Sequence, residues 1–456
     1  METDQSDVLI LGGGSAGYAC ALRAAQLDKS VTLIEARKVG GTCLHNGCIP
    51  TKAILHAAEI ADMTRAGTRF GVRSVFDGVD IESLHEYRDG TIDKLYTGLR
   101  GLLAQRGVRT VEGFGTFVGD RTIVVDGRRY TGDSVVLASG SRSRTLPGFD
   151  AGPRILTSAE ALTLNHIPDS VIVLGGGVIG VEFASAWRSF DAQVTIVEAL
   201  PRLVAGEDNW ASTQLERALR RRGISVRTST PVSAAAETDD GVRITLSDGS
   251  FLSADVLLVA VGREPRTDES GYAENGIVLD RGFVVTDDHL RTNLSDVYAA
   301  GDIVAGPQLA HRGFAHGIFI AEHIAGLSPI PVADHLIPRI TYSHPEVASV
   351  GYSEESARER FGDVESIVYD LAGNGRSRIL GTSGGVKVVR AVGGPVLGVH
   401  MVGDRVGELI GEAQLTVAWE ALPSDVAPFV HAHPTQNEAL GEAMLALAGK
   451  GLHVHE

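Results

Sequence analysis

Short apolar runs followed by glycine turns set the pattern of the first part of the chain. Residues 7–11 predict a buried strand, residues 12–17 a glycine-rich turn, and the stretch up to Leu27 a helix. Residues 31–35 predict a second strand that ends in an acidic side chain, Glu35. A lone glycine motif is weak evidence, but strand, glycine turn, helix and terminal acid together are typical of a dinucleotide-binding βαβ unit.

The same arrangement recurs in the middle of the chain. Residues 171–174 predict a strand and 175–180 a glycine turn, and a second strand at 194–198 ends in Glu198 at the spacing seen for Glu35. Two dinucleotide sites are therefore expected, and a protein with two such sites usually holds one flavin and one nicotinamide. The glycines that let a pyrophosphate approach the helices are Gly12, Gly14, Gly17, Gly175, Gly177 and Gly180.

The C-terminal part of the chain has a different pattern. After residue 336, apolar runs typical of antiparallel strands alternate with helical patterns. The predicted strands are residues 340–342 and 385–390, and the predicted helices are residues 408–420 and 437–447. This region is expected to form a separate α+β domain.

Length and charge narrow the class of protein. At 456 residues the chain exceeds what one hydrophobic core usually organises, so about three domains are expected. The formal net charge of -16 argues against a nucleic-acid partner, because phosphate neutralisation needs clustered Lys and Arg. The acidic, polar N-terminus has no signal-peptide pattern, and no apolar run reaches the ~18 residues of a membrane span. We expect a cytoplasmic enzyme with no membrane partner.

Cysteine usage points to chemistry and not to a structural disulfide framework, since only three cysteines occur in the chain. Cys43 and Cys48 lie in a glycine-rich segment shortly after Glu35, so they are expected beside the first dinucleotide site. The pair suits thiol-disulfide exchange, and a helix beginning near it would lower the thiol pKa. A zinc half-site is the alternative, but the chain has no second cysteine pair to complete it, and no metal is expected. Cys20 is expected to be a small core residue.

The segment GGTCLHNGCIPTK, residues 40–52, resembles the flavin-dependent pyridine nucleotide-disulfide oxidoreductases, and the resemblance covers essentially the whole chain. It implies an α/β fold with two Rossmann-like dinucleotide-binding domains, for FAD and NAD, plus a C-terminal α+β dimerisation domain. The expected boundaries are 1–145 and 268–335 for a discontinuous FAD-binding domain, 146–267 for the NAD-binding domain and 336–456 for the interface domain.

The resemblance also implies roles for individual residues. Cys43 would exchange with the substrate, and Cys48 would face the flavin. Lys52 and Glu182 would form an ion pair near the flavin's reactive nitrogen. Asp302 would bind the ribityl chain, although an acid after a buried strand can also be a simple turn-former. The remaining cofactor residues would be Gly12, Gly14, Gly17, Glu35, Thr42 and Gly140 for FAD, and Gly175, Gly177, Gly180, Glu198 and Gly262 for NAD.

Near the C-terminus, a histidine and a carboxylate supply a candidate acid-base pair. Glu438 follows His433 at a spacing that lets it orient the ring and stabilise the imidazolium. A metal-binding or merely exposed His-x-His is the alternative reading of this segment. The HPTQNE segment is similar to the family's HPTxxE motif, which implies that His433 and Glu438 act on the partner subunit's disulfide in an obligatory homodimer. His453 and His455 lie in a polar tail and are expected to have no catalytic role.

The acid that ends the second nucleotide unit favours NAD over NADP. Glu198 would accept hydrogen bonds from the ribose hydroxyls and repel a 2'-phosphate. Arg202 is the argument for NADP, because arginine commonly binds that phosphate, although a surface salt bridge is its more ordinary role. Ser139 and Arg266 depart from the family's usual pattern, and these departures bear on fine cofactor contacts and not on the reaction.

The reaction implied is oxidation of protein-bound dihydrolipoyl groups to lipoyl groups with reduction of NAD+ to NADH. The implied partners are a second copy of the chain and a lipoyl-bearing acyltransferase or lipoyl protein of a 2-oxoacid dehydrogenase or glycine cleavage complex. A related NAD(P)H-dependent disulfide reductase, a docking scaffold and a flavin diaphorase that reduces quinones are the alternatives.

Overall fold

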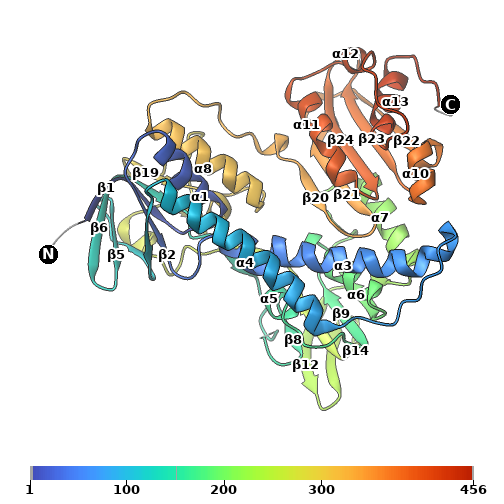
Figure 1. The fold of residues 1–456 in the computed structure, drawn as a ribbon, viewed down its shortest axis with the longest axis horizontal. Helices are drawn as coiled ribbons and strands as arrows, with labels where there is room; N and C mark the ends of the chain where they lie inside the picture. The colour runs from blue at the N-terminus through green and yellow to red at the C-terminus, as the bar shows by residue number, and fades with distance from the viewer. Residues whose placement is uncertain (1–3, 150, 454–456) are drawn as a thin grey trace. The chain divides into compact units, whose positions relative to one another are not determined.

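The computed structural model describes residues 4–149 and 151–453, and these residues divide into two units (Figure 1). Of the described residues, unit 1 contains 4–53, 82–144 and 262–334, and unit 2 contains 54–81, 145–149, 151–261 and 335–453. None of the helices in the described residues combines the length and apolar character that a membrane span needs.

The central sheet of unit 1 has the order β3-β2-β1-β6-β5-β4, and β19 also pairs with β6. Its strands are β1 (Asp4–Leu11), β2 (Val31–Glu35), β3 (Arg109–Glu112), β4 (Thr116–Phe117), β5 (Thr122–Val125), β6 (Arg128–Leu137) and β19 (Val297–Ala299). The strands β3, β2, β1, β6 and β19 are mutually parallel where they pair. Their carboxyl ends therefore lie at one edge of the sheet, where an open α/β sheet binds its ligand. The predicted strand at 31–35 is confirmed.

Two helices with closely packed backbones cover this sheet, α1 (Ser15–Gln26) and α8 (Ala310–Ile324). Glycines make the close approach possible: a Cβ on Gly317 would lie 2.3 Å from the Ala16 carbonyl oxygen, and one on Gly313 would lie 2.7 Å from the Ser15 hydroxyl. The other elements of the unit are α4 (Ile81–Gln105), the β-ribbon of β7 (Ser141–Ser143) and β16 (Arg263–Pro265), and the pair β17 (Leu279–Asp280) and β18 (Phe283–Val284).

Unit 2 contains a second parallel sheet, of order β11-β10-β9-β15-β8. Its elements are β8 (Ile155–Leu156), α5 (Ser158–Ala161), β9 (Ser170–Leu174), α6 (Val178–Ser189), β10 (Gln193–Val197), α7 (Asn209–Arg221), β11 (Ser225–Arg227) and β15 (Val256–Val259). An antiparallel sheet of β12 (Val232–Thr238), β13 (Gly241–Leu246) and β14 (Phe251–Ala254) precedes β15 in the chain. The second predicted βαβ unit is confirmed.

The C-terminal sheet of unit 2 is antiparallel, with the order β20-β21-β24-β23-β22. Its strands are β20 (Arg339–Thr341), β21 (Glu346–Gly351), β22 (Val364–Asp370), β23 (Gly385–Ala391) and β24 (Val396–Gly403). The helices of this region are α9 (Glu354–Phe361), α10 (Gly375–Leu380), α11 (Ile410–Ala418), α12 (Pro423–Val426) and α13 (Glu438–Leu447). Together these elements confirm the predicted α+β character of this region.

Alternation along β21 shows how this sheet is buried on both faces. Val347 packs into the core that contains α7, whereas Ala348 and Val350 pack into the core formed with α11 and α13. Successive side chains of a strand point to opposite faces, so one strand serves both cores. Figure 1 shows α11 and α13 lying against the strands of this sheet.

The first residue of β21 carries a carboxyl group that makes stability depend on pH. Burial raises the pKa of Glu346 to about 7, and the nearby acids Asp404, Glu408 and Glu59 add to the rise, although the Gly407 N–H opposes it. The folded state therefore holds this proton more tightly than the unfolded state. The stabilisation is fully present at pH values below the usual carboxyl range and is lost as the pH rises toward 7.

We expect Glu346→Gln to raise the thermal unfolding midpoint by a few degrees at pH 8, which corresponds to about 2 kcal/mol, and to change it little at pH 4.5. The glutamine oxygen can still accept the Gly407 N–H, which lies 2.8 Å from the carboxylate. Glu354→Gln is a control with the opposite expected change in stability, because Lys387 lowers the Glu354 pKa. It should destabilise the protein at pH 8, and a Glu346→Gln variant that melts lower there would contradict the prediction.

Candidate active site

The two glycine turns have nearly the same backbone geometry. The first glycine of each turn has a positive φ, 104° at Gly12 and 109° at Gly175. A Cβ there would lie 2.2 Å from the Ala138 carbonyl oxygen in unit 1 and 2.3 Å from that of Ala260 in unit 2. Both positions need glycine for conformation and for space.

The third glycine of each turn sets how closely strand and helix pack. A Cβ on Gly17 would lie 1.8 Å from the Gly12 carbonyl oxygen, and one on Gly180 would lie 2.0 Å from that of Gly175. Any side chain at these positions would push the helix away from its strand, so the turns are as tight as a pyrophosphate site requires.

The middle glycine of each turn faces open space. No heavy atom would lie within 4 Å of a Cβ on Gly14 or Gly177, and neither residue caps its helix through a side chain. The first N–H groups of α1 and α6 therefore point to positions that a phosphate can occupy. The residues present fit a dinucleotide in each unit.

Each predicted acid accepts a hydrogen bond from the backbone of its own glycine turn. Glu35 accepts the Gly13 N–H over 2.7 Å, and Glu198 accepts the Gly176 N–H over 2.6 Å. The second oxygen of Glu198 accepts the Leu200 N–H over 2.7 Å. Both carboxylates are thus fixed beside the helix N-termini, where ribose hydroxyls would come.

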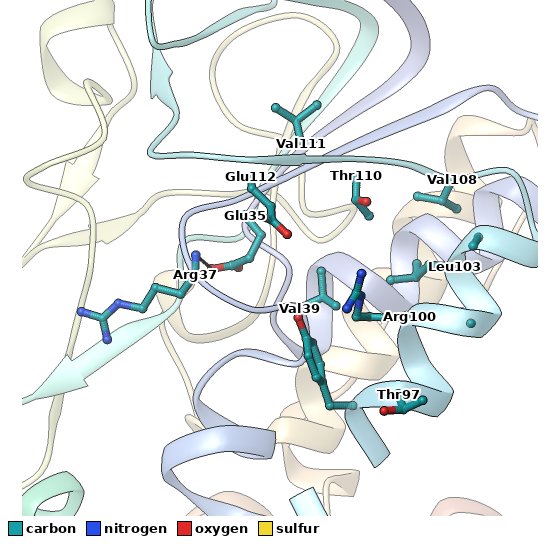
Figure 2. Close-up of a pocket in the computed structure, with 13 residues that line it drawn as sticks. Glu35, Arg37, Val39, Thr97, Arg100, Leu103, Val108, Thr110, Val111 and Glu112 are labelled. Carbon is teal, nitrogen blue, oxygen red and sulfur yellow. Dashed lines mark hydrogen bonds between the residues drawn. The ribbon is translucent and has the colours of Figure 1, made fainter. Parts of the chain in front are cut away.

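A pocket of about 340 Å³ opens beside Glu35 in unit 1. It is lined by Glu35, Arg37 and Val39, by Tyr96, Thr97, Arg100, Gly101, Leu103 and Ala104 of α4, and by Val108, Thr110, Val111 and Glu112. Figure 2 shows Glu35 and Glu112 on one side of the pocket and Thr97 and Arg100 on the other. The pocket thus adjoins Glu35, the acid that accepts the Gly13 N–H of the first glycine turn.

Asp302 is held by residues that were not among the predicted site residues. Its carboxylate accepts the Ser141 hydroxyl over 2.5 Å, and that hydroxyl in turn accepts the Arg263 Nε–H over 2.7 Å. Ser141 and Arg263 lie on β7 and β16, which pair as an antiparallel ribbon next to Gly140 and Gly262. The available signals in the sequence were the positions of Ser141 and Arg263 directly after the predicted residues Gly140 and Gly262.

The two positions that depart from the family's usual pattern contact each other. The Ser139 hydroxyl donates to the Arg266 carbonyl over 2.6 Å, and the Tyr272 hydroxyl donates to Ser139 over 2.9 Å. A serine therefore keeps a donor at this position, and Arg266 takes part through its backbone.

The cysteine pair lies on two successive helices, of which the first, α2, contacts the first glycine turn. Cys43 is in α2 (Gly41–Asn46), and Cys48 begins α3 (Cys48–Ala66). Gly41 has a φ of 59°, and a Cβ on it would lie 2.7 Å from the Cα of Gly14. This contact holds the cysteine segment against the first glycine turn.

Cys43 and Cys48 are both thiols, joined by a side-chain hydrogen bond. That bond and burial raise the pKa of the Cys43 thiol, although the Lys52 ammonium opposes the rise. The lowered thiol pKa expected from a nearby helix start is therefore wrong for Cys43. Burial raises the pKa of the Tyr18 hydroxyl in α1 to about 12, and the nearby sulfurs of Cys43 and Cys48 add to the rise. Thr42 precedes Cys43 on the exposed side of α2.

The side chains of His433 and Glu438 are in contact, as their spacing predicts. Nδ1 of His433 lies 2.8 Å from a carboxylate oxygen of Glu438, and the other oxygen accepts the Thr435 N–H over 2.8 Å. Burial by itself raises the pKa of Glu438, but the Thr435 N–H and the His433 ring lower it more, so it lies below its usual value. The His433 side chain is 78% exposed and so is open to a reacting group.

The two residues of the expected flavin ion pair belong to different units. Lys52 lies in unit 1, in the fifth position of α3, and Glu182 lies in unit 2 on α6. Glu182 is 2% exposed and accepts the Tyr342 N–H over 2.9 Å. Cys20, expected to be a core residue, is fully buried, and burial raises the pKa of its thiol to about 12.

Both nucleotide units and the cysteine pair match the model of the pyridine nucleotide-disulphide oxidoreductase family over residues 6–317, and residues 337–444 match that family's dimerisation domain. The chain belongs to this family and is an FAD-dependent disulfide oxidoreductase that uses FAD and NAD(H). The predicted fold class, two nucleotide-binding domains and a C-terminal dimerisation domain, is confirmed.

Within the family, the chain groups with the dihydrolipoyl dehydrogenases. It is 37% identical to the dihydrolipoyl dehydrogenase of Bacillus subtilis over 98% of this chain and 99% of the relative. It is 36% identical to that of Mycobacterium tuberculosis over 97% of this chain and 98% of the relative.

Solved structures agree in fold. Mycobacterium tuberculosis LpdA has a TM-score of 0.91 at 26% identity, covering 97% of this chain and 99% of that one. RclA, an HOCl-induced flavoprotein disulfide reductase from Escherichia coli, has a TM-score of 0.84 at 25% identity over 96% of this chain and 99% of that one.

Proposed function

We propose that this protein oxidises protein-bound dihydrolipoyl groups to lipoyl groups and reduces NAD+ to NADH. The observation that carries the proposal is the hydrogen-bonded Cys43 and Cys48 pair, anchored to the first glycine turn by the contact between Gly41 and Gly14. A dithiol beside a flavin-type turn suits exchange with a substrate dithiol. The curated relatives named dihydrolipoyl dehydrogenase support the choice of substrate.

The thiol chemistry follows from the residues of the pair. His433 takes a proton from one substrate thiol, and the thiolate attacks Cys43 of the oxidised Cys43-Cys48 disulfide. The Cys43-Cys48 bond breaks, a mixed disulfide forms, and Cys48 leaves as a thiolate. The second substrate thiol then displaces Cys43, which releases the oxidised lipoyl group and leaves the enzyme as a dithiol. Glu438 orients His433 and stabilises its imidazolium.

FAD held at the first site would supply the two-electron chemistry that links this dithiol to NAD+. We assign FAD to the turn of Gly12, Gly14 and Gly17 together with Glu35, beside the pocket of Figure 2. The further FAD residues proposed are Thr42, Lys52, Gly140 and Asp302, and the NAD residues proposed are Gly175, Gly177, Gly180, Glu182, Glu198 and Gly262.

Selectivity for NAD is assigned to Glu198. Its carboxylate is fixed by two backbone N–H groups and would repel a 2'-phosphate. The Arg202 guanidinium donates to the Ala205 carbonyl over 2.9 Å, so this arginine is engaged within its own loop. NAD is therefore the preferred nicotinamide.

We propose a homodimer in which His433 and Glu438 of one protomer serve the cysteine pair of its partner. The exposure of His433 and the match to the family's dimerisation domain support this arrangement. The lipoyl substrate would arrive on an acyltransferase or lipoyl protein of a 2-oxoacid dehydrogenase or glycine cleavage complex. We also propose the domain boundaries given in the sequence analysis.

The deciding experiment measures NADH formation from dihydrolipoamide by the purified flavoprotein, with NADP+ in a parallel reaction. Fast turnover with NAD+ and little with NADP+ is the expected result. Turnover with other disulfides or with quinones, but none with dihydrolipoamide, would overturn the substrate assignment and favour the alternative reductases of the family.

A further inference from the structure

The loop after β10, residues 199–208, lies directly on the second glycine turn. The Val204 N–H donates to the Gly176 carbonyl over 2.8 Å. Leu203 is fully buried, and a Cβ on Gly176 would lie 2.4 Å from its Cδ2 atom. The loop directly follows Glu198, which accepts the Gly176 N–H. The shape of this nucleotide site therefore depends on where the loop is held.

The loop does not hold its own conformation by local preference alone. Val204 has a φ of 40°, a region that β-branched residues rarely adopt. Such a backbone persists only when the surroundings restrain it on several sides. The other end of the loop shows what supplies the restraint.

That end carries two buried acids held by the C-terminal sheet. Asp208 accepts the Lys387 ammonium of β23 over 2.8 and 3.0 Å. Its neighbour Glu207 accepts the Arg339 guanidinium of β20 over 3.0 and 3.4 Å. Asp208 also caps α7 by accepting the Trp210 N–H over 2.8 Å. The Asp208 carboxylate thus connects the 199–208 loop to α7 and to the C-terminal sheet.

The charged groups of Asp208 and Lys387 are buried. The side chain of Asp208 is 2% exposed and that of Lys387 is 8% exposed, and Lys387 also contacts Glu354 over 2.9 Å. A buried pair of this kind adds little over an apolar contact, but removal of one partner leaves the other charge uncompensated. The geometry of the loop should therefore respond strongly to loss of either cation.

We propose that Lys387 and Arg339 are positioning residues for the nicotinamide nucleotide, because they hold Asp208 and Glu207 and so fix the 199–208 loop against Gly176. The affinity of the nucleotide is then set in part by the C-terminal sheet, through residues that do not touch the nucleotide. The inference rests on the proposed assignment of NAD to the second glycine turn.

The test compares holoenzyme variants by their dissociation constant for NADH, measured by fluorescence titration of the fully reduced protein so that no hydride is transferred, and by bound FAD, measured by absorbance of the oxidised protein. Lys387→Met should weaken NADH binding about tenfold. It should leave the FAD content and the KM for dihydrolipoamide unchanged while the KM for NAD+ rises. Lys387→Arg should recover most of the affinity, because it keeps a cation at Asp208.

Arg390→Gln is the matched control, because Arg390 lies on the same strand and pairs with Glu365 instead of the loop. It should bind NADH normally. Arg339→Gln, at a position 24% exposed, provides a milder variant that decides the question if Lys387→Met does not fold. A folded Lys387→Met variant with unchanged NADH affinity would overturn the proposal. If that variant does not fold, unchanged NADH affinity in Arg339→Gln would overturn it.

Glu198→Ala separates this inference from the assignment on which it rests. If Glu198→Ala weakens NADH binding and the Lys387 and Arg339 variants do not, only the positioning role fails. If Glu198→Ala also binds NADH normally, the nucleotide site itself is wrongly assigned and the inference falls with it. If the Arg390→Gln control weakens NADH as much as Lys387→Met, the effect is a general loss of stability and the proposal is overturned.

Discussion

Replacement of Cys48 by serine should abolish dihydrolipoamide oxidation while FAD stays bound. A serine hydroxyl cannot form the disulfide with Cys43 or leave as a thiolate, so turnover should fall on the order of 10³-fold or more. The glycine turn at Gly12 and the carboxylate of Asp302 are untouched by the change, so the absorbance of bound flavin should remain. NADH formation per bound flavin is the measurement.

Cys20→Ala is the control for loss of a cysteine. Cys20 is fully buried in α1 and its thiol pKa is raised to about 12 by burial, so it is inert at working pH. The variant should keep its turnover, at some cost in stability from the small cavity. Full dihydrolipoamide turnover in Cys48→Ser would refute the proposed mechanism, and retention of only quinone reduction would indicate that flavin chemistry persists without the thiols.

His433→Gln should lower kcat for dihydrolipoamide oxidation by roughly 10²–10⁴-fold, the usual contribution of a positioned acid-base group. The reason is geometric: Glu438 is fixed by the Thr435 N–H and orients the imidazole over a 2.8 Å contact. Glutamine can accept and donate hydrogen bonds but cannot take the thiol proton. The reaction of NADH with the flavin needs no such base, so it should proceed at the normal rate in a stopped-flow experiment.

A second histidine-glutamate pair in the same region provides the control. Nδ1 of His453 lies 2.8 Å from Glu442, at a side chain that is 68% exposed. His453→Gln removes an equivalent exposed pair and should leave kcat unchanged. A loss in His453→Gln equal to that in His433→Gln would show that the effect is not specific to the proposed base.

Much of the site could be predicted because its parts are local in the chain. Gly12 and Gly17 act within one turn, and their tight contacts follow from one strand entering one helix. Cys43 and Cys48, like His433 and Glu438, are close in sequence, so spacing alone brings them together. Local backbone geometry is decided by local residue types, and glycine is the clearest of these.

The support of Asp302 could not be predicted in the same way. Ser141 and Arg263 reach it only because β7 and β16 pair antiparallel, with Arg263 opposite Ser143. Nothing in the residues around 141 or 263 specifies that register, since it results from how the chain leaves one sheet and later returns. The same holds for Lys387 and Asp208, which are buried together although they lie far apart in the chain.

The sequence by itself therefore determined the two nucleotide turns with Glu35 and Glu198, the dithiol and the histidine-carboxylate pair, because each depends on neighbours along the chain. The tertiary structure decided which hydroxyls, cations and loops hold those groups in place: Ser141 and Arg263 at Asp302, and Lys387 at Asp208. These contacts join residues that only strand pairing and core packing bring together, and long-range burial, not local preference, selects them.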